Sequence, residues 1–358
     1  MTPAPPPPSS IDSSIPAAEP VPGARGSASS AGLEPGASAS EPAVRVTDLT
    51  HRYPKADRDA LRQLSLEVRR GEAFALLGPN GGGKTTTFRI LATLLQPSDP
   101  AGRVEVFGHD AATDPAAARR MIGVVFQSPS LDQKLTAHEN LAVQARMYGL
   151  SRRESRPRID AALGMFGLGS RPDDAVESFS GGMRRKLEIA KALLHHPPLL
   201  LMDEPATGLD PAARRELWDH LLQLKRERGL TIAWTTHLMD EAERADRLAI
   251  LVGGRIIAHD APARLKASQG RHVVCVQPHD PARLAEVRDR LERELGPWSA
   301  GQAPVIVDDE VRFDHASGPE VVAQVTERFE GQLRRVAVGE PTLEDAYLRL
   351  TADATVDN

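Results

Sequence analysis

The stretch ALLGPNGGGKTTTFRIL, residues 75–91, decides the fold. It places Gly78, Gly83, Lys84 and Thr85 in the spacing G-x-x-x-x-G-K-[ST], after an apolar strand and before a helical segment. Glycines let backbone amides curl around phosphate oxygens, and the N-terminus of the following helix adds partial positive charge. The stretch therefore predicts a phosphate-binding loop. A glycine-rich turn with an incidental lysine would not need this strand, loop and helix in succession.

The side chains of this loop have separate tasks. Lys84 is expected to bridge the β- and γ-phosphates of a nucleotide, and the hydroxyl of Thr85 is expected to ligate Mg²⁺. The other positions offer backbone amides to the phosphates. The predicted nucleotide-binding residues of the loop are Gly78, Pro79, Asn80, Gly81, Gly82, Gly83, Lys84, Thr85 and Thr86.

Short apolar strands alternate with helical stretches around this loop. They read AFALLG, IGVVF, LLLMD, TIAWTTH and RLAILV. Strands with nearly continuous apolar sequence between helices indicate an α/β fold with a parallel sheet covered on both faces. The segments AVRVTDLTHRYP and ALRQLSLEVRRGEAFALLG, which come before the lysine, alternate in the manner of β-strands.

Changes in composition divide the chain into three parts. Residues 1–42 form a Pro/Ser/Ala/Gly tail, which we expect to be disordered and which lacks the pattern of a secretory signal. Residues 43–267 hold the nucleotide-binding domain, interrupted by mostly helical sequence at about 128–196. Residues 268–358 follow a β-α-β-β-α-β succession, which predicts a small ferredoxin-like α+β domain.

Bulk composition excludes several classes of protein. The 358 residues carry a net charge of −5, so nucleic acid is not the expected partner. The single cysteine, Cys275, excludes an internal disulfide framework and suits a reducing compartment. The longest apolar stretches are only strand-sized, whereas a membrane helix needs about 20 residues. Any membrane spans that the function requires would therefore be supplied by another chain.

An acidic pair follows a four-residue apolar strand, in PPLLLMDEPATGLD. Asp203 can hold the Mg²⁺ shell, and Glu204 can polarise an attacking water as general base. An acidic turn that merely caps a strand is common, but this explanation is less expected when the chain also has a phosphate loop. Asp210 is a weaker candidate for nucleotide binding, since it could simply cap the helix that Pro211 begins.

Three further residues gain interest from their position. Gln127 and His237 each follow an apolar strand, at the sheet edge where sites in open α/β folds collect. Gln127 could reach Mg²⁺ or the attacking water, and His237 could hydrogen-bond the γ-phosphate, so both join Glu204 as candidate catalytic residues. Tyr53 could stack on the adenine ring, although a surface strand also explains it.

The stretch FSGGMRRKLEIAKALLHH, residues 179–196, reads as an amphipathic helix. Ser180 is a good N-cap, which is the simplest explanation of that serine. The two glycines after it, Gly181 and Gly182, weaken a helix and leave its first amides open to another molecule. The stretch therefore has the properties of an anion site without an anion of its own.

Taken together, these residues resemble the nucleotide-binding subunit of an ATP-binding cassette transporter. The matching segments are, in the family's order, GPNGGGKTT, VVFQSPSLD, FSGGMRRKLEIA, LLLMDEPATGLD and TTHLMDEAE, across about residues 43–265. The resemblance implies an ATP-binding α/β core, a β-subdomain near the N-terminus and a helical subdomain. Phe179 and Met183 depart from the commonest signature. Met183 and the terminal PTLEDAYLRLTA resemble the daunorubicin-resistance-type subfamily, which exports drugs and polysaccharides.

The resemblance also implies a partner and a reaction. In this family two subunits stack head-to-tail, so Ser180, Gly181 and Gly182 would close on the Mg-ATP of the other copy. Hydrolysis would power export through a separate integral membrane permease, with the homodimer at the cytoplasmic face of the cell membrane. The sequence does not identify the exported molecule.

Two other classes remain as alternatives. A soluble ATPase of the same superfamily, acting on nucleic acid or ribosomes, usually has a second cassette or a long coiled coil, and neither is visible here. A phosphate-loop kinase or GTPase would have no use for the second anion site at Ser180.

Overall fold

The computed structural model describes residues 41–268, 272–296, 303–315 and 317–356. Most of the tail expected at 1–42 lies outside these residues. In the described part of the chain, none of the helices is long and apolar enough to cross a membrane.

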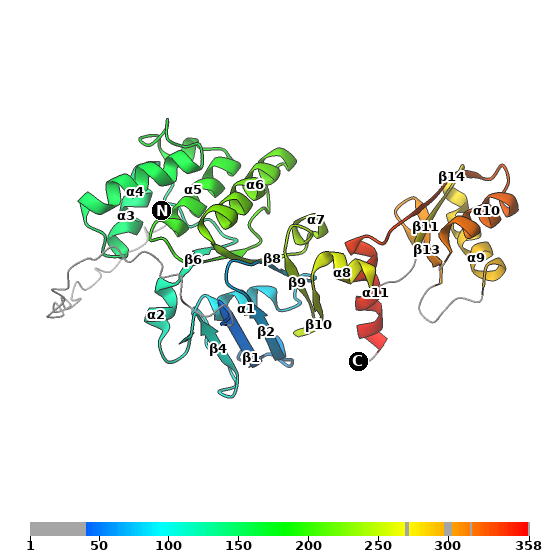
Figure 1. Cartoon of the computed structure of the whole chain (residues 1–358), viewed down its shortest axis with the longest axis horizontal. Helices are drawn as coiled ribbons and strands as arrows, with labels where there is room; N and C mark the ends of the chain where they lie inside the picture. The colour runs from blue at the N-terminus through cyan, green and yellow to red at the C-terminus, as the bar shows by residue number, and fades with distance from the viewer. Residues whose placement is uncertain (1–40, 269–271, 297–302, 316, 357–358) are drawn as a thin grey trace, which may run out of the picture. The chain divides into compact units, whose positions relative to one another are not determined.

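A six-stranded sheet carries the phosphate-binding loop (Figure 1). Its order is β10-β9-β3-β8-β7-β6, and all neighbours are parallel except the β9–β10 hairpin. The predicted parallel sheet is therefore confirmed, with one antiparallel edge strand added. The strands are β3 (Ala73–Leu77), β6 (Ile122–Val125), β7 (Leu199–Asp203), β8 (Thr231–Thr236), β9 (Arg247–Val252) and β10 (Arg255–Asp260).

Apolar side chains alternate along these strands into two separate cores. Leu77, Met202 and Ile232 join one hydrophobic cluster, whereas Leu76, Leu201 and Ala233 join another. Since successive strand residues point to opposite faces, both faces of the sheet are covered. The surrounding helices are α1 (Lys84–Leu91), α2 (Pro115–Arg120), α6 (Pro211–Arg228) and α7 (Met239–Ala242).

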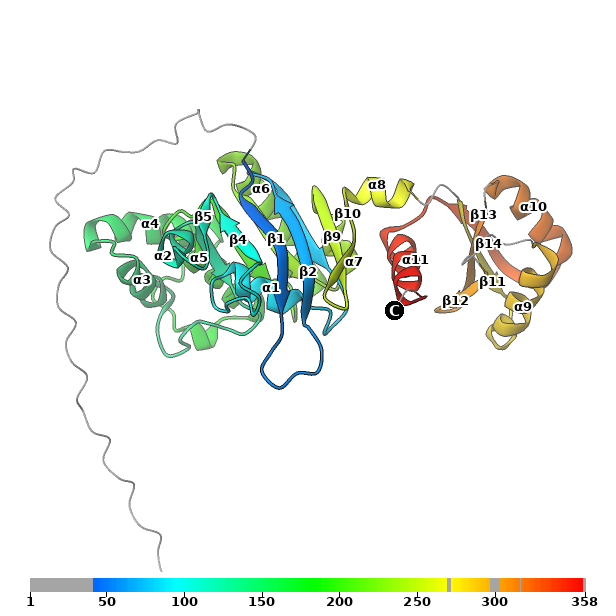
Figure 2. The same ribbon diagram turned by 90° about the horizontal axis from the view of Figure 1, so that it is seen from below.

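The alternating segments at the start of the domain form a second, antiparallel sheet. Its order is β2-β1-β4-β5, and Figure 2 shows β1, β2 and β4 side by side. This sheet is the β-subdomain that the family resemblance implied. Its strands are β1 (Val44–His51), β2 (Leu61–Val68), β4 (Arg103–Val106) and β5 (His109–Asp110).

Between β6 and β7 the chain is helical, as its sequence predicted. Capping boxes start two of the helices, with Thr136 paired to Glu139 and Ser151 paired to Glu154. The three longer helices pack against one another, and the third also packs against β6 and α6. The elements are α3 (Ala137–Met147), α4 (Arg152–Met165), the 3₁₀ turn η1 (Val176–Ser178) and α5 (Gly181–Leu193).

After α8 (Pro262–Ala267), the last part of the chain has the predicted β-α-β-β-α-β order. Its antiparallel sheet, β12-β13-β11-β14, has the strand order of a ferredoxin-like domain. Val274, Phe313 and Phe329 lie in its core. The elements are β11 (His272–Pro278), η2 (Pro281–Arg283), α9 (Leu284–Glu294), β12 (Val305–Val307), β13 (Glu310–His315), α10 (Gly318–Arg328), β14 (Leu333–Gly339) and the terminal α11 (Leu343–Val356).

Candidate functional site

The phosphate-binding loop runs from Gly78 to Gly83, between β3 and α1. A Cβ at Gly78 would lie 2.2 Å from the carbonyl oxygen of Leu251, so any side chain there would displace backbone. Gly83 has φ 108°, and a Cβ there would meet the carbonyl of Ala60 at 2.7 Å. The shape of the loop therefore requires glycine at positions 78 and 83.

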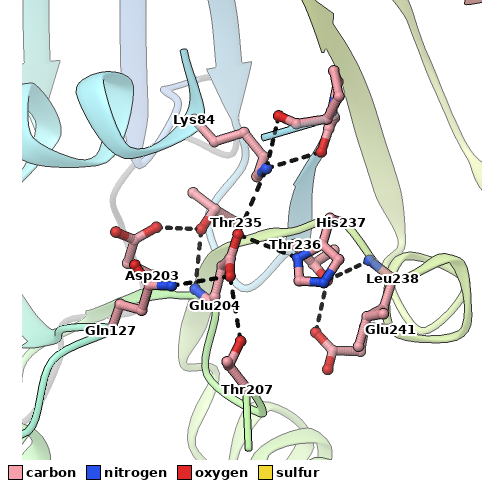
Figure 3. Close-up of polar contacts among 12 residues, drawn as sticks. Lys84, Gln127, Asp203, Glu204, Thr207, Thr235, Thr236, His237, Leu238 and Glu241 are labelled. Atoms are coloured by element: carbon pink, nitrogen blue, oxygen red, sulfur yellow. Dashed lines mark hydrogen bonds and ion pairs between the residues drawn. The ribbon is translucent and has the colours of Figure 1, made fainter. Parts of the chain in front are cut away.

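Lys84 begins α1 and turns its ammonium group back into the loop (Figure 3). Its Nζ donates to the carbonyls of Gly78, at 2.8 Å, and Pro79, at 3.0 Å, and lies 3.6 Å from Oε1 of Glu204. Burial lowers the pKa of Lys84, while the carboxylates of Glu204 and Asp203 oppose that shift. The cation is thus desolvated and aimed at the space that the loop encloses.

Asp203 is the last residue of β7, and its side chain is buried. Its Oδ1 accepts a hydrogen bond of 2.5 Å from Thr235 at the same edge of β8. Burial raises the pKa of Asp203, and the hydroxyls of Thr235 and Thr85 oppose the rise. Mg²⁺ usually takes one or two protein oxygens beside water and phosphate. The adjacent oxygens of Thr85 and Asp203 fit that requirement.

Glu204 connects the residues that the sequence singled out separately. Its Oε2 accepts hydrogen bonds of 3.3 Å from Gln127 and from Thr207, and its Oε1 lies 3.3 Å from Nδ1 of His237 (Figure 3). Its φ of 45° is unusual for a non-glycine residue. Strain of this kind persists where the surroundings hold a side chain in a required place.

His237 follows β8 and is partly exposed, with a side-chain exposure of 40%. The chain beyond it is held by the hydroxyl of Thr236, which donates to buried Glu241 at 2.8 Å and accepts from the amide of Leu238 at 3.0 Å. Burial raises the pKa of Glu241. The sequence analysis did not predict four of these supporting residues, namely Thr207, Thr235, Thr236 and Glu241. Each lies within a few residues of Glu204 or His237 in the sequence, and that proximity could have indicated them.

Two weaker candidates have different surroundings. The hydroxyl of Tyr53 lies 3.2 Å from that of Thr86, which places the tyrosine beside the phosphate loop. Asp210 caps α6, because its carboxylate accepts from the amides of Ala212 and Ala213 at 3.0 and 2.9 Å. These two hydrogen bonds lower the pKa of Asp210, with that from Ala213 the larger cause. The capping explanation of Asp210 therefore holds in this structure, and its contact with a nucleotide stays a prediction.

The serine and glycines of the predicted second anion site lie outside this cluster. Ser180 caps α5 by accepting from the amide of Met183 at 3.2 Å, and both Ser180 and Gly181 are exposed. A Cβ at Gly181 would meet nothing within 4 Å. Among the described residues, no recorded hydrogen bond or ion pair joins Ser180 to the cluster around Glu204. The exposed start of α5 therefore leaves room for a group of another molecule.

The cluster as a whole suits hydrolysis of a nucleoside triphosphate. A glycine loop, a helix N-terminus and a buried lysine can hold the phosphates. Beside them, a carboxylate is held by Gln127, Thr207 and Lys84, where it can accept the proton of a water. The structure brings together Gln127, Asp203, Glu204 and His237, and it leaves Ser180 outside.

Comparison with known proteins agrees with this chemistry. Residues 61–207 match the family model described as ABC transporter. The daunorubicin/doxorubicin resistance ATP-binding protein of Streptomyces peucetius is 38% identical over 83% of this chain and 89% of its own length. A Nod factor export ATP-binding protein of Rhizobium etli is 39% identical over 86% of this chain and 93% of its own.

One similar solved structure is a dimer. It is a dimeric post-hydrolysis form of an ATP-binding cassette bound to ADP and phosphate. It shares 28% identity with this chain, covers 61% of it and 98% of itself, and superposes with a TM-score of 0.55.

Proposed function

Since this chain belongs to the ABC transporter family, as an ATP-binding subunit, we propose that two copies close head-to-tail around two Mg-ATP. Hydrolysis in that dimer would power export through a separate integral membrane permease. The observation that carries the proposal is a mismatch within one chain. Glu204 and Lys84 lie in a buried cluster whose polar groups are paired with one another, whereas the glycine-opened end of α5 is exposed.

Each side chain has a role in the proposed reaction. Lys84 and the loop amides hold the β- and γ-phosphates. Glu204 takes a proton from water as the water oxygen attacks the γ-phosphorus, and the bond from that phosphorus to the bridging oxygen of ADP breaks. Gln127 and Thr207 orient the Glu204 carboxylate through its Oε2. His237, which lies against its Oε1, is placed to contact the γ-phosphate.

Thr85 and Asp203 would hold Mg²⁺, with Gln127 nearby. The bound ion would neutralise charge on the β- and γ-phosphates. Burial of Asp203 favours this role, because a desolvated carboxylate gains most from a cation beside it. Ser180, Gly181 and Gly182 would donate to the γ-phosphate held by the partner copy.

The test uses Glu204→Gln, which keeps the size of the side chain but cannot accept the proton of water. ATP should then persist, and it should favour the dimer by mass action because it binds that state better. Light scattering at high protein concentration should show an ATP-dependent shift from monomer to dimer. The shift should vanish when Ser180→Arg is added. If the double variant dimerises as well as the single one, Ser180 is only a helix cap.

The permease would dock on the helical region and hold the chain at the cytoplasmic face of the membrane. Large apolar side chains are exposed on one stretch of α3, where Val143 is 46% exposed and Met147 76%. These two residues lie four apart on the helix, and neighbouring exposed apolar side chains are a candidate protein-binding surface. The alternative of a soluble ATPase on nucleic acid or ribosomes is not favoured, because the similar proteins carry names of drug-resistance and export ATP-binding proteins.

Cell fractionation tests this docking. In its native cells, the chain should be recovered with membranes, and Met147→Glu should move it to the supernatant. Val305→Glu, which changes another exposed apolar residue in β12, is the matched control and should stay with membranes. Equal recovery of all three proteins with membranes would contradict docking through α3.

A further inference from the structure

Arg185 lies on α5, five residues after Ser180, and its side chain is almost fully buried. Its guanidinium donates to the carbonyls of Pro205 and Phe126, each at 2.6 Å. It also approaches the carbonyls of Asp203 and Glu204, at 3.4 and 3.5 Å. These carbonyls belong to the two segments that carry Gln127 and Glu204.

Two more residues of α5 hold the segment after Gln127. Glu188 accepts from the amide of Ser130 at 2.8 Å, and it pairs with Arg185 at 2.7 Å. Lys191 donates to the carbonyl of Ser130 at 2.7 Å. One face of α5 therefore holds the segment from Phe126 to Ser130 at three main-chain positions.

The simplest explanation is that Arg185 and Glu188 form an ion pair that only stabilises the fold. A buried pair of this kind adds little net stability, because desolvating both charges offsets their attraction. The ion pair alone also leaves the carbonyl contacts unexplained. A guanidinium presents several donors in a rigid plane, which suits simultaneous binding of carbonyls from two segments. Arg184, the preceding residue on the helix, donates among the described residues only to the carbonyl of Phe179, just before its own helix.

We propose that Arg185 is a positioning residue that ties the Gln127 and Glu204 segments to the helix that completes the other ATP site of the dimer. The inference rests on the proposed function. Gln127 and Glu204 contact each other where the attacking water and γ-phosphate would lie. Their main chains are bound to α5 through Arg185, and the exposed end of α5 serves the partner. Nucleotide bound at one site thereby sets the position of the serine that closes the second site.

Such a link is a coupling free energy between two sites, and typical couplings change affinity about 5–150-fold. Losing it should leave nucleotide binding to the monomer intact, because Arg185 touches no residue of the phosphate loop in the recorded contacts of the described chain. It should weaken only the ATP-dependent closure of the dimer. A residue with a purely structural role would lower both, together with the melting temperature.

The experiment compares three proteins in the Glu204→Gln background. Arg185→Lys keeps the charge beside Glu188 but loses the planar fork. Arg184→Lys is the matched control on the same helix. Arg185→Met with Glu188→Gln removes both buried charges together, and it keeps a side-chain oxygen for the amide of Ser130. A fluorescent ATP analogue at low protein concentration reports monomer binding, and light scattering at high concentration reports dimerisation.

Both Arg185 variants should bind the analogue within about twofold of the parent, yet require about 10-fold more ATP to dimerise. Arg184→Lys should behave as the parent. Dimerisation of the Arg185 variants at the parent's ATP concentration overturns the role of Arg185 and leaves the composite site standing. If both Arg185 variants lose analogue binding and dimerisation to the same extent, the role of Arg185 is also overturned. If Glu204→Gln alone does not dimerise with ATP, the proposed function fails and this inference falls with it.

Discussion

The two halves of the proposed ATP site differ in how completely their own chain satisfies them. Around Glu204, every charged group is buried or held by a neighbour: Lys84 by two carbonyls, Asp203 by Thr235 and Glu204 by Gln127. At the start of α5, Ser180 and Gly181 are exposed, and within the described part of the chain the serine side chain bonds only to the amide of Met183 in its own helix. In the proposed dimer, the first half is preorganised for catalysis, and the second would act when another copy supplies a phosphate.

Because of this difference, substitutions in the two halves should impair different ATP sites. A change in the buried half should stop the reaction at the site of the changed chain. A change in the exposed half should spare nucleotide binding by its own chain and impair the site of the partner. The following variants test that separation, beginning with the largest effect.

Lys84→Ala should reduce ATP hydrolysis by at least about 10³-fold, since it removes the cation between the β- and γ-phosphates. Nucleotide affinity should fall as well. Phosphate release by the purified variant measures the effect, with Arg89→Ala on the exposed side of α1 as control. Robust hydrolysis by Lys84→Ala would remove the assignment of this loop as the catalytic phosphate site.

Glu204→Gln should slow turnover by roughly 10²–10⁴-fold, which is the usual contribution of a positioned base. Unlike Lys84→Ala, it should leave ATP binding nearly unchanged, because Lys84, Thr85 and Asp203 are untouched. Single-turnover hydrolysis and equilibrium binding on the same preparation separate the two quantities. A loss of binding equal to the loss of turnover would mean that Glu204 serves the structure of the loop and not the chemistry.

The catalytic residues could be predicted from the sequence, whereas the residues that position them could not. Lys84, Asp203, Glu204, Gln127 and His237 lie at or just beyond the ends of predicted elements, so their meeting follows from a parallel sheet. The partners that position them were not predictable in this way. Thr235 meets Asp203 across 32 residues of sequence, and Arg185 meets Phe126 across 59. The first contact depends on which strands are neighbours and on their register, because Thr235 of β8 is paired with Asp203 of β7. The second depends on how α5 packs against the sheet, and the apolar pattern determines neither.

Asp210 shows the opposite limit. Its place in the GLD motif suggested a nucleotide contact, but the same residue type and position also fit an N-cap, and only the cap is seen within one chain. Ser180 likewise fits both a helix cap and a nucleotide contact. A residue that can cap a helix and also face a partner cannot be assigned from one chain alone.

Ser180→Asp separates these two roles. Aspartate caps a helix as well as serine does, so the free energy of unfolding should stay within about 0.5 kcal/mol of the parent. Its charge would repel the γ-phosphate of the partner, so ATP-dependent dimerisation and hydrolysis should fall by about 10-fold or more. Urea unfolding and light scattering measure the two effects. Normal hydrolysis by a stable Ser180→Asp protein would contradict the shared site.

His195 lies just past the other end of α5, and it sharpens the comparison because its contacts lie within one chain. Its ring stacks on Tyr148 at the end of α3, with centroids 3.8 Å apart, and its Nε2 lies 3.2 Å from the carbonyl of Ile122. Its Nδ1 is buried and has no hydrogen-bond partner among the residues that the structure describes. An added proton there would have no acceptor, and burial lowers the pKa of His195 to about 4.

The smallest predicted effect concerns the stability that neutral His195 contributes. The unfolded chain takes up this proton near pH 6.5 and the folded chain only near pH 4, so the contribution is complete above pH 6.5 and is lost as pH falls towards 4. With allowance for partial exposure, about 1–2 kcal/mol should be lost between pH 7 and pH 5. His195→Gln can still donate to Ile122 and does not titrate. Urea unfolding should therefore show a steeper loss for the parent than for this variant between these pH values. Identical slopes would mean that the ring is charged or solvated in the folded protein, and that this end of α5 is as open as the end at Ser180.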